Sequence, residues 1–358
     1  MSAAPRVLLT VSGTIPADLD DAVAAGRRPR ADYRVIATRL RADVADRAVA
    51  LAACGRIGRL IERFGGVGPL LAWYAFRNRR RYDVLLTDGE QVGLPLALLA
   101  RVLGRGAARH VMIVHVMSVA KKARLVRWTR IAGMIDTYLV YASAQAEYLA
   151  GHLGVAPERV VRLPFMVDPD FFDPAVAPSE RRRMICSAGL ERRDYTTLMR
   201  AVEGLDADVV IAAASPWSKW ADSSQGAVPP SNVTIERLDL FDLRALYAAS
   251  TLVVVPLEPV DFQAGITTIL EAMAMRRTVV CSRAPGQTDT IVDGETGVYV
   301  PPGDAVALRA TLERLLDDPA ELERIGGNAR EWVVAHAAVD RYAEQIADVL
   351  ADVLADVV

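Results

Sequence analysis

Short runs of apolar, β-branched residues alternate along the chain with longer stretches in which apolar residues recur at helical spacing. This alternation predicts successive strand–helix units around parallel sheets whose strands are buried on both faces. In the first half the expected strands are Arg6–Val11, Tyr33–Thr38, Asp83–Thr87, His110–Val116 and Thr137–Tyr141, and Leu94–Val102 is an expected helix. In the second half the expected strands are Met184–Ala188, Asp208–Ala213, Val233–Ile235, Thr251–Val255 and Thr278–Cys281, with Tyr299–Pro302 as a short edge strand.

A stretch rich in proline and aspartate, LPFMVDPDFFDPAVAPS at 163–179, interrupts this alternation. Prolines at this density do not suit a regular helix. We therefore expect an N-terminal domain over residues 1–168, a linker over 169–180, a C-terminal domain over 181–340, and a terminal helix over 341–358 that could pack back on the N-terminal domain. Two doubly wound, Rossmann-like α/β domains facing across a cleft would bind ligands at the carboxyl ends of their strands.

Composition agrees with a folded protein of about two domains. The 358 residues are 52% hydrophobic and 24% charged, and the formal net charge of -2 gives no indication of a nucleic-acid partner. The charge is unevenly divided, because residues 1–179 carry 25 Lys+Arg against 16 Asp+Glu, whereas residues 180–358 carry 17 against 28. Two explanations stay open: an anionic partner or membrane surface for the first half, or attraction between the halves.

The sequence shows no feature that would direct the chain to a secretory pathway or into a membrane. The N-terminal MSAAPRVLLTV has no signal-peptide pattern, and no apolar run reaches about 18 residues. The cysteines Cys54, Cys186 and Cys281 have neither disulfide-framework nor zinc-ligand spacing. We expect a cytoplasmic protein, which could also lie peripherally at the inner face of the membrane, and its richness in Ala and Arg hints at a GC-rich bacterial genome.

The segment Val254–Pro302 carries the most informative chemistry. An apolar strand ends at Pro256, a loop carries Gly265, and a helix is expected to begin near Thr267 or Thr268 with Glu271 in its first turn. The unpaired backbone N–H groups of such a helix start favour a phosphate, and a glycine lets the ligand approach closely. Thr268 and Glu271 also fit a capping box, which would make the glutamate purely structural.

Four stretches, ILEAMA, TVV, DGETGVYVPPGD and LLDDPAELERIGGNAR, resemble the retaining glycosyltransferases of family 4, which have the GT-B fold. The first half is similar more loosely, through a glycine loop after the first strand, Ser143 after an apolar strand, and LPFMVD at 163–168. The resemblance implies a hexosyltransferase-type enzyme that moves a sugar from a nucleoside-diphosphate donor to an acceptor with retention of configuration. We expect neither a metal nor another cofactor, because arginines can supply the positive charge and the sequence has no acidic DxD-type pair in a matching context.

The same resemblance implies roles for individual donor-site residues. Glu271 would contact the ribose hydroxyls, and Gln263 stands where the family has a first glutamate near the transferred sugar. Arg193 stands where the family has a lysine, so Arg193 and its neighbour Arg192 would neutralise the diphosphate. The alternative is that both arginines lie solvated at a helix start. The remaining donor contacts that we expect are Ser12, Gly13, Gly189, Gly265, Ile266, Thr267 and Thr268.

His115 follows an apolar strand, and the family places a histidine near the reacting centre of the sugar in this neighbourhood. His115, Arg193 and Gln263 are therefore the catalytic candidates, although a lone histidine is often structural. Asp88 and Glu90 are candidates for acceptor binding or activation, or alternatively helix caps.

Two basic patches, Arg77–Arg81 and Lys121–Arg130, lie near aromatic residues. They could contact anionic lipid, receive a phosphorylated acceptor, or form a solvated face. The aromatic residues are Trp73, Tyr74, Phe76 and Trp128.

Two other functions stay open beside sugar transfer. A nucleotide-sugar epimerase or hydrolase of the same fold would act on the donor alone. A catalytically silent subunit would bind a sugar nucleotide without turnover, because Gln263 lacks the family's charge.

Overall fold

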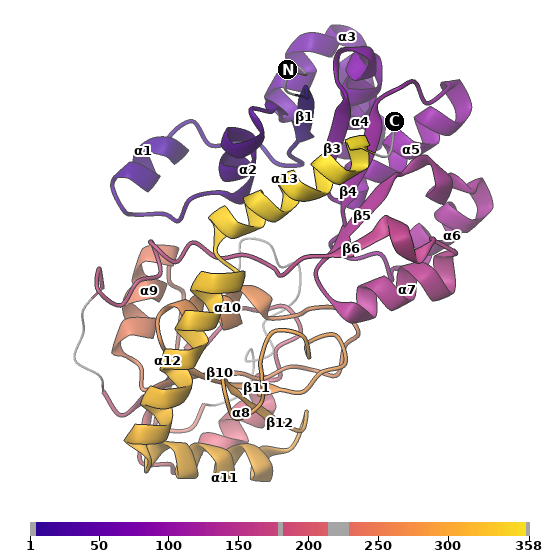
Figure 1. Cartoon of the computed structure of the whole chain (residues 1–358). Coiled ribbons are helices and arrows are strands. Elements are labelled where there is room, and N and C mark those ends of the chain that lie inside the picture. Colours follow the sequence, from indigo (N-terminus) through magenta and orange to yellow (C-terminus); the bar gives the residue numbers. More distant parts are fainter. Residues whose placement is uncertain (1–4, 178–181, 214–228, 356–358) are drawn as a thin grey trace. The chain divides into compact units, whose positions relative to one another are not determined.

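The computed structural model describes residues 5–177, 182–213 and 229–355, and the chain groups into two compact units. The first unit comprises Met1–Leu19, Ala31–Leu163 and Tyr342–Val358, and the second comprises Asp20–Arg30 and Pro164–Arg341. Each unit is built around its own six-stranded sheet and is described by itself (Figure 1).

The limits of these units differ in detail from the expected domain ranges. Residues 20–30 group with the second unit, and the second unit begins again at Pro164, before the expected boundary at 168. The last helix is divided, since the chain from Tyr342 onward groups with the first unit. Residues 178–180 of the expected linker lie outside the described residues.

All strands of the first unit run parallel, in the order β2-β1-β3-β4-β5-β6. The strands are β1 Val7–Thr10, β2 Asp43–Ala45, β3 Val84–Asp88, β4 Arg109–Ile113, β5 Thr137–Val140 and β6 Val160–Arg162. The helices are α2 Asp32–Leu40, α3 Arg47–Gly65, α4 Val67–Asn78, α5 Glu90–Leu103, α6 Ala120–Thr129 and α7 Ser143–Leu153, with 3-10 turns at Arg79–Arg81, Ile131–Met134 and Pro157–Arg159. The strand order reverses between β1 and β3, so the loops after these strands form the expected ligand-binding edge.

The expectation of a strand over Tyr33–Thr38 is wrong, because this segment lies inside helix α2. Ile36 is the one buried residue of that helix, so the segment faces a core on one side only. A short apolar run does not distinguish a strand from such a helix. The three-residue strands β2 and β6 were not expected, since neither has a continuous apolar run of strand length.

The second unit is also fully parallel, in the order β12-β11-β10-β7-β8-β9. Its strands are β7 Met184–Ala188, β8 Asp208–Ala212, β9 Val233–Glu236, β10 Leu252–Val255, β11 Thr278–Ser282 and β12 Val298–Val300, all close to the expected ranges. Its helices are α1 Leu19–Ala24, α8 Tyr195–Val202, α9 Leu240–Ala249, α10 Ile266–Ala274, α11 Ala305–Leu316 and α12 Pro319–His336. Helix α1 begins at the limit of the first unit, and α13 Val339–Ala355 begins in the second unit and continues into the first. The strand order reverses between β7 and β10.

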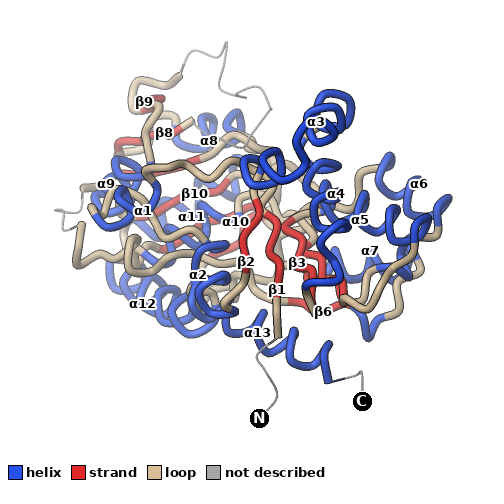
Figure 2. The backbone as a smooth tube through the Cα atoms, turned by 90° about the horizontal axis from the view of Figure 1, so that it is seen from above, coloured by secondary structure: helices blue, strands red, loops and turns tan. Residues whose placement is uncertain are grey.

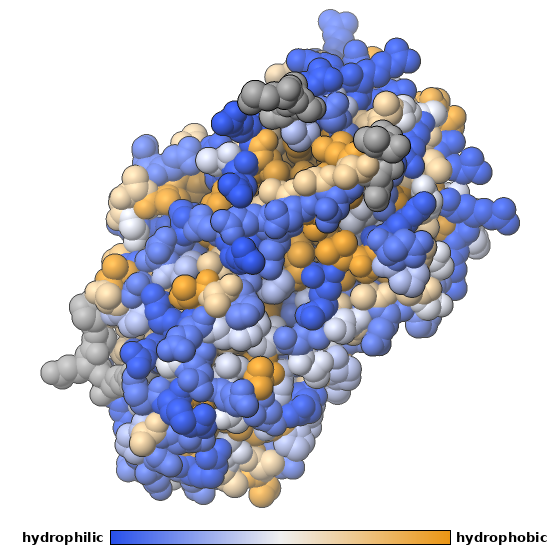
Figure 3. Space-filling model, in the orientation of Figure 1, coloured by the Kyte–Doolittle hydropathy of each residue, from blue (hydrophilic) through white to orange (hydrophobic). Residues whose placement is uncertain are grey.

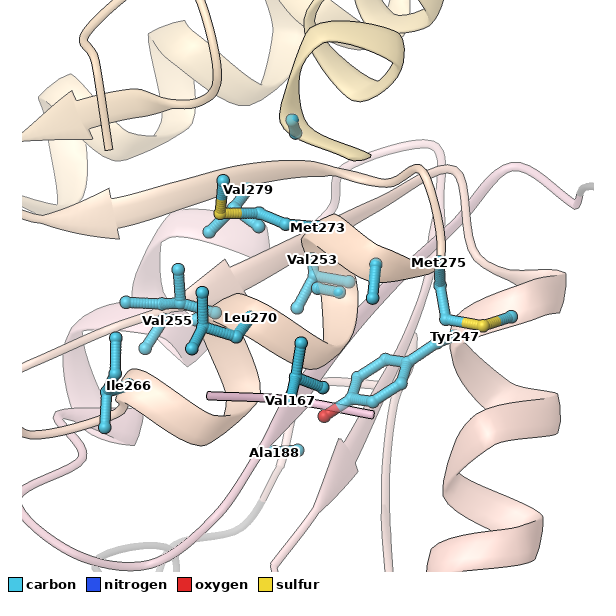
Figure 4. Packing of buried hydrophobic residues seen from close by; sticks show 14 of the residues in the cluster. Val167, Ala188, Tyr247, Val253, Val255, Ile266, Leu270, Met273, Met275 and Val279 are labelled. Carbon is cyan, nitrogen blue, oxygen red and sulfur yellow. The ribbon is translucent and has the colours of Figure 1, made fainter. Parts of the chain in front are cut away.

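The central strands of the second unit, β7, β10 and β11, are buried on both faces, as their apolar sequences predict, whereas the edge strand β9 is partly exposed. Alternate residues of the same strands enter two separate cores. Cys186, Val253 and Val279 pack into one cluster with α9, α10 and α12, part of which Figure 4 shows. Their neighbours Ile185, Leu252 and Val280 pack into another cluster with α8 and α11. The expected fold class of two doubly wound α/β sheets is thereby confirmed (Figure 2).

Helix α13 is amphipathic, in agreement with the apolar stripe near the end of the sequence. Tyr342, Ala343, Ile346 and Leu350 are buried, and the side that Figure 3 shows is mainly hydrophilic. Among the described residues, none of the helices combines the length and the apolar character needed to cross a bilayer.

Candidate functional site

The loops that follow β7 and β10 lie together at the switch point of the second sheet. Two backbone hydrogen bonds join them: Asp194 N–H donates to the Pro256 carbonyl and Glu258 N–H to the Arg192 carbonyl, each at 3.0 Å. Arg193 lies between these bonds and pairs with Leu257 in an isolated antiparallel bridge. The two loops therefore form one fixed wall at the edge where doubly wound sheets bind ligands.

Two glycines with positive φ leave room around the Arg193 guanidinium. Gly189 has φ +92°, and a Cβ there would lie 2.6 Å from Arg193 Nη2. Gly265 has φ +78°, and a Cβ there would lie 2.8 Å from Val255 Cγ1 and 3.4 Å from Arg193 Nη1. Both the backbone conformation and the available space therefore require glycine at these positions.

The Arg193 side chain is buried and held in place by oxygen atoms of three neighbours. Its Nε donates to the Ala188 carbonyl at 2.9 Å and its Nη1 to the Glu191 carbonyl at 2.7 Å. Its Nη2 donates to Thr268 Oγ1 at 3.2 Å. The alternative of a solvated arginine is wrong for Arg193, because the guanidinium is fixed beside the first turn of α10.

Helix α10 begins at Ile266, slightly earlier than expected, and its N-cap is Gly265. Glycine has no side chain to accept from the backbone N–H groups of Ile266, Thr267 and Thr268, so this helix start can donate to an anion. The capping-box alternative is wrong. Thr268 is already inside the helix, and the Glu271 carboxylate bonds a tyrosine of another helix.

Glu271 lies in the second turn of α10 rather than the first, and it is partly exposed. The hydroxyl of Tyr247, from α9, donates to its Oε2 at 3.0 Å. No described residue donates to the other carboxylate oxygen, Oε1. Figure 4 shows the Tyr247 ring inside the apolar cluster beside Val167. One oxygen is thus fixed and the other is available to a ligand hydroxyl.

The surroundings of Glu271 raise the pKa of its carboxyl group to about 7. Burial among apolar side chains raises this pKa, whereas the Tyr247 hydrogen bond and the positive charge of Arg193 lower it by a smaller amount. A carboxyl group that titrates near neutrality close to the carboxyl ends of the strands is typical of functional sites.

Gln263 and Arg192 lie on the same two loops but have different partners from Arg193. The Gln263 amide donates from Nε2 to Thr290 Oγ1 at 3.3 Å, and its Oε1 is buried with no partner among the described residues. Arg192 is only partly buried and pairs with Glu258 at 3.0 Å. The structure thus distinguishes the buried Arg193 from the partly exposed Arg192, although the sequence assigns both arginines the same role.

The first unit gathers a different set of side chains at the carboxyl ends of its strands. His115, after β4, lies with its Nε2 2.9 Å from Asp88 Oδ1 at the end of β3. Burial disfavours the charged imidazolium, but the hydrogen bond with Asp88 and the charges of Asp88, Glu90 and Asp32 outweigh it, so the pKa of His115 is raised. The two predicted residues form a dyad that is partly open to solvent.

Glu90 is buried and supports the loop that carries His115. Its two oxygens accept from the backbone N–H groups of His115 and Val116, at 3.0 and 3.1 Å, and from the ammonium group of Lys122. The Gln145 amide donates to the His115 carbonyl at 2.7 Å from the other side of the loop. We therefore correct the expectation for Glu90: it positions His115 rather than facing an acceptor.

Sequence reasoning missed Asp32, at the start of α2. Burial and the charge of Asp88 raise the pKa of Asp32 to about 6, while hydrogen bonds to backbone N–H groups and the charge of His115 lower it by a smaller amount. The fold also brings the hydroxyls of Tyr141 and Tyr342 within 2.9 Å of each other, although they are far apart in the chain. Asp32 had no detectable signal, because its segment was expected to be a strand.

The other predicted residues of the first unit lie on its surface. Ser12 and Gly13 follow β1, and Gly13 is exposed. The basic patches fall on the end of α4 with its 3-10 turn and on α6, where Trp128 is 85% exposed. Within the described ranges, no group of three or more His, Cys, Asp or Glu side chains could hold a metal ion, and the expectation that no metal is required stays a prediction.

Comparison with known proteins agrees with this geometry. Residues 182–318, which contain the site of the second unit, match the family model described as "Glycosyl transferases group 1". The chain is 29% identical over 213 residues to the MMP alpha-(1->4)-mannosyltransferase of Mycolicibacterium hassiacum, covering 57% of this chain and 51% of that protein. It is 39% identical over 105 residues to a lipopolysaccharide core biosynthesis mannosyltransferase of Rhizobium leguminosarum, covering 29% of each. The matches thus span about half or less of these relatives.

Solved structures resemble the whole fold. The Anabaena protein HepE, solved in complex with UDP-glucose, superposes with a TM-score of 0.71 at 16% identity, covering 97% of this chain and 100% of that one. Sucrose-phosphate synthase from Thermosynechococcus elongatus gives a TM-score of 0.70 at 18% identity, covering 98% and 100%. Two doubly wound sheets, these neighbours and the family match agree. The chain therefore has the GT-B fold, and its residues 182–318 match the family of glycosyl transferases group 1.

Proposed function

We propose that this protein is a glycosyltransferase that moves a hexose from a nucleoside-diphosphate donor to an acceptor with retention of configuration. The observation that carries the proposal is the arrangement in the second unit. A buried arginine, an uncapped helix start and a carboxylate with one available oxygen meet at the β7–β10 switch point.

In this proposal the second unit binds the donor. Arg193 and the first N–H groups of α10 hold the diphosphate and stabilise the charge that develops on it as the sugar leaves. Glu271 accepts from the ribose hydroxyls through Oε1, while Tyr247 fixes its orientation. Arg192 contributes positive charge from farther out, since it also pairs with Glu258.

The acceptor belongs in this proposal to the first unit. The His115–Asp88 dyad offers a hydrogen-bonding imidazole at a strand end, and Asp32 adds a second carboxyl group. These groups suit an acceptor or sugar rich in hydroxyls. Ser12 and Gly13 remain candidate donor contacts from the loop after β1.

The relatives suggest which donors to test first. Two of them are mannosyltransferases by name, and one structural neighbour was solved with UDP-glucose. A thermal-shift screen should therefore include GDP-mannose and UDP-glucose beside ADP- and dTDP-sugars, because a ligand that binds only the native state raises the melting temperature.

The deciding experiment measures calorimetric affinity for the nucleoside diphosphate found in this screen, in the wild type and in Glu271→Ala. We expect a loss of at least tenfold, since the ribose hydroxyls lose a charged acceptor. Glu331→Ala is the control, because it removes an exposed glutamate of α12 in the same unit that has no part in the proposed site. Equal affinity of Glu271→Ala and wild type would contradict the placement of the nucleotide.

Two alternatives remain distinguishable by donor turnover. Steady conversion of the donor without any acceptor would favour an epimerase or hydrolase. Tight nucleotide binding with no turnover for any acceptor would favour a silent binding subunit, for which Gln263 is the relevant observation because it lacks a charge.

Peripheral contact with an anionic membrane completes the proposal for the first unit. Its support is the excess of basic residues in the first half and the two basic patches at Arg77–Arg81 and Lys121–Arg130.

A further inference from the structure

Helix α3 carries an exposed face that neither the transfer reaction nor the two basic patches account for. Phe64 is 79% exposed, Leu60 58% and Ile57 55%, all on one helix of the first unit. Figures 1 and 2 both show α3 at the periphery of that unit. Exposed apolar residues scattered singly need no explanation, but three within eight residues of one helix do.

Helix α3 is broken by a kink at Gly55, whose φ of +55° and ψ of -130° are not helical, and the three exposed apolar residues all lie in the segment after this kink. The opposite face of that segment is packed on α4 at Gly58, which fixes the orientation of the exposed face, whereas the buried residues Ala50 and Cys54 lie before the kink. A Cβ at Gly58 would lie 2.7 Å from Cys54 Cβ and 3.2 Å from Leu70 Cδ1, so the helices are in contact at this point. The exposed side chains therefore cannot turn inward without separating α3 from α4.

The exposed surface consists of two adjacent stripes. At about 100° per residue, Ile57, Leu60 and Phe64 fall within about 60° of each other around the helix axis. A second stripe, also about 60° wide and centred about 100° away, is formed by Arg56, Arg59 and Arg63, which are all exposed.

The arginine stripe keeps its positive charge available. The one acidic residue of the segment after the kink, Glu62, is paired with Arg47 of the segment before it. No described residue forms an ion pair with Arg56, Arg59 or Arg63, although the Arg63 guanidinium lies over the Phe64 ring at 5.8 Å. A helix with apolar and arginine stripes side by side is typical of one that lies in a membrane interface.

We propose that α3 is a membrane-docking helix whose apolar stripe enters the interface of an anionic bilayer. Ile57, Leu60 and Phe64 would insert among the upper acyl chains, and Arg56, Arg59 and Arg63 would contact the phosphate groups of anionic lipids. The positive charge of the arginine stripe favours an anionic lipid surface over a protein partner. The proposal does not depend on how the second unit binds a sugar donor.

The test is flotation of the full chain with vesicles of phosphatidylcholine alone or mixed with phosphatidylglycerol. We expect the wild type to bind the anionic vesicles preferentially, and more weakly at high salt. The triple variant Arg56→Gln, Arg59→Gln, Arg63→Gln should lose about fivefold in binding per arginine. The triple variant Ile57→Ser, Leu60→Ser, Phe64→Ser should lose roughly tenfold or more.

Two controls separate this site from others. Val292→Ser, Val306→Ser, Val334→Ser removes three exposed apolar side chains from the second unit and should leave vesicle binding unchanged. Arg124→Gln, Arg127→Gln, Arg130→Gln alters the patch on α6 and should cost less than the α3 variants. Nucleotide affinity and melting temperature should be unchanged in both α3 variants, which distinguishes this proposal from a failure of the donor site.

Three outcomes would overturn the proposal. The first is a wild type that does not bind anionic vesicles at low salt. The second is binding that is lost with the α6 variant but kept with the α3 variants. The third is a loss with the α3 arginine variant alone, which would replace insertion by adsorption of charge at the surface.

Discussion

The two sheets place opposite chemistry at the same kind of topological position. In the second unit, the switch point between β7 and β10 gathers a buried arginine and an uncapped helix start, both of which attract anions. In the first unit, Asp88 at the end of β3 and Asp32 at the start of α2 place two carboxyl groups near His115, which follows β4. Shared topology thus fixes where the ligands bind, whereas a few loop residues decide which ligands they are.

Removing the positive charge of the second unit should have the largest effect. We expect Arg193→Ala to lower turnover by about two to three orders of magnitude, the scale seen when a preorganised charge stabiliser is lost. The variant should also lose roughly 1–3 kcal/mol of unfolding free energy, because Thr268 and two carbonyls lose their buried donor. Initial rates and urea unfolding measure both.

Arg192→Ala is the comparison for this prediction. Arg192 pairs with Glu258 in a partly exposed position, so its stability effect should not exceed about 1 kcal/mol and its rate effect should be several-fold smaller. Arg193→Lys retains the positive charge but has no planar guanidinium, so its rate shows whether the several N–H donors of arginine matter in addition to the charge. Equal losses of turnover in Arg192→Ala and Arg193→Ala would show that the burial of Arg193 does not give it a larger role than Arg192.

Changes to the dyad of the first unit should affect turnover but not donor binding. We expect Asp88→Asn and His115→Ala to lower the rate by about ten- to a hundredfold, within the range for a single polar group in a reaction centre. Nucleotide affinity should stay at the wild-type value, because our proposal assigns the nucleotide to the second unit. Weakened nucleotide affinity in Asp88→Asn would break the proposed division of labour between the units.

The same dyad predicts a pH effect on stability. The pKa of His115 is raised in the folded chain, so its pairing stabilises the fold fully below the unfolded pKa of about 6.5 and is lost as pH rises through the folded value. Asp88→Asn should therefore be destabilised more at pH 6 than at pH 9. An NMR titration of the His115 ring should show its pKa falling in Asp88→Asn, and an unchanged value would mean that Asp88 is not what raises it.

Sequence reasoning reached further in the second unit than in the first. The sequence predicts all six strands of the second sheet within about one or two residues, because the central strands β7, β10 and β11 are continuous apolar runs buried on both faces. In the first unit Tyr33–Thr38 was assigned to a strand, and Asp43–Ala45 was missed because three residues give too little pattern.

Sequence reasoning is limited in the same way for the candidate functional sites. Glu271 and Arg193 stand out through local motifs, whereas their partners Tyr247 and Thr268 depend on which elements the fold brings together. Tyr247 lies 24 residues from Glu271 in the chain, and no spacing rule joins them. Side chains that hold a functional group in place are therefore the part that needs a structure.

A pH series on Glu271→Gln tests the balance between burial and ligand binding in the second unit. The wild-type carboxyl has a folded pKa of about 7, above its unfolded value, so stability is fully present below about pH 4.5 and declines as pH rises to 7. The amide variant cannot ionise and can still accept from Tyr247. It should be more stable than the wild type at pH 8, by about 1–2 kcal/mol given the partial exposure of the group, and equal to it at about pH 4.

Urea unfolding at both pH values measures this difference. A gain at pH 8 together with weaker nucleotide binding would mean that the charged carboxylate is kept for the ligand at a cost in stability. Equal stability of variant and wild type at pH 8 would show that solvent or a neighbouring group already compensates the charge of Glu271.

The smallest expected effect is that of Gln263→Glu, which gives the second unit a further carboxylate and so makes it more like the first. Thr290 donates through its hydroxyl as readily as it accepts, so it can satisfy a glutamate at the position where it now accepts from Gln263 Nε2 at 3.3 Å. The Gln263 Oε1 has no partner among the described residues, so the new charge would be only partly compensated. We expect a loss of about 1 kcal/mol of stability and a change in relative rates among sugar donors of a few-fold, since in our proposal residue 263 contacts sugar hydroxyls and not the diphosphate. Competition between two sugars on the same nucleoside diphosphate measures this preference directly. The opposite result would be a fixed sugar preference together with a loss of nucleotide affinity as large as in Glu271→Ala. Residue 263 would then act on the nucleotide. In that case the contrast between the cationic site of the second unit and the acidic site of the first would extend over the whole segment from Gln263 to Glu271.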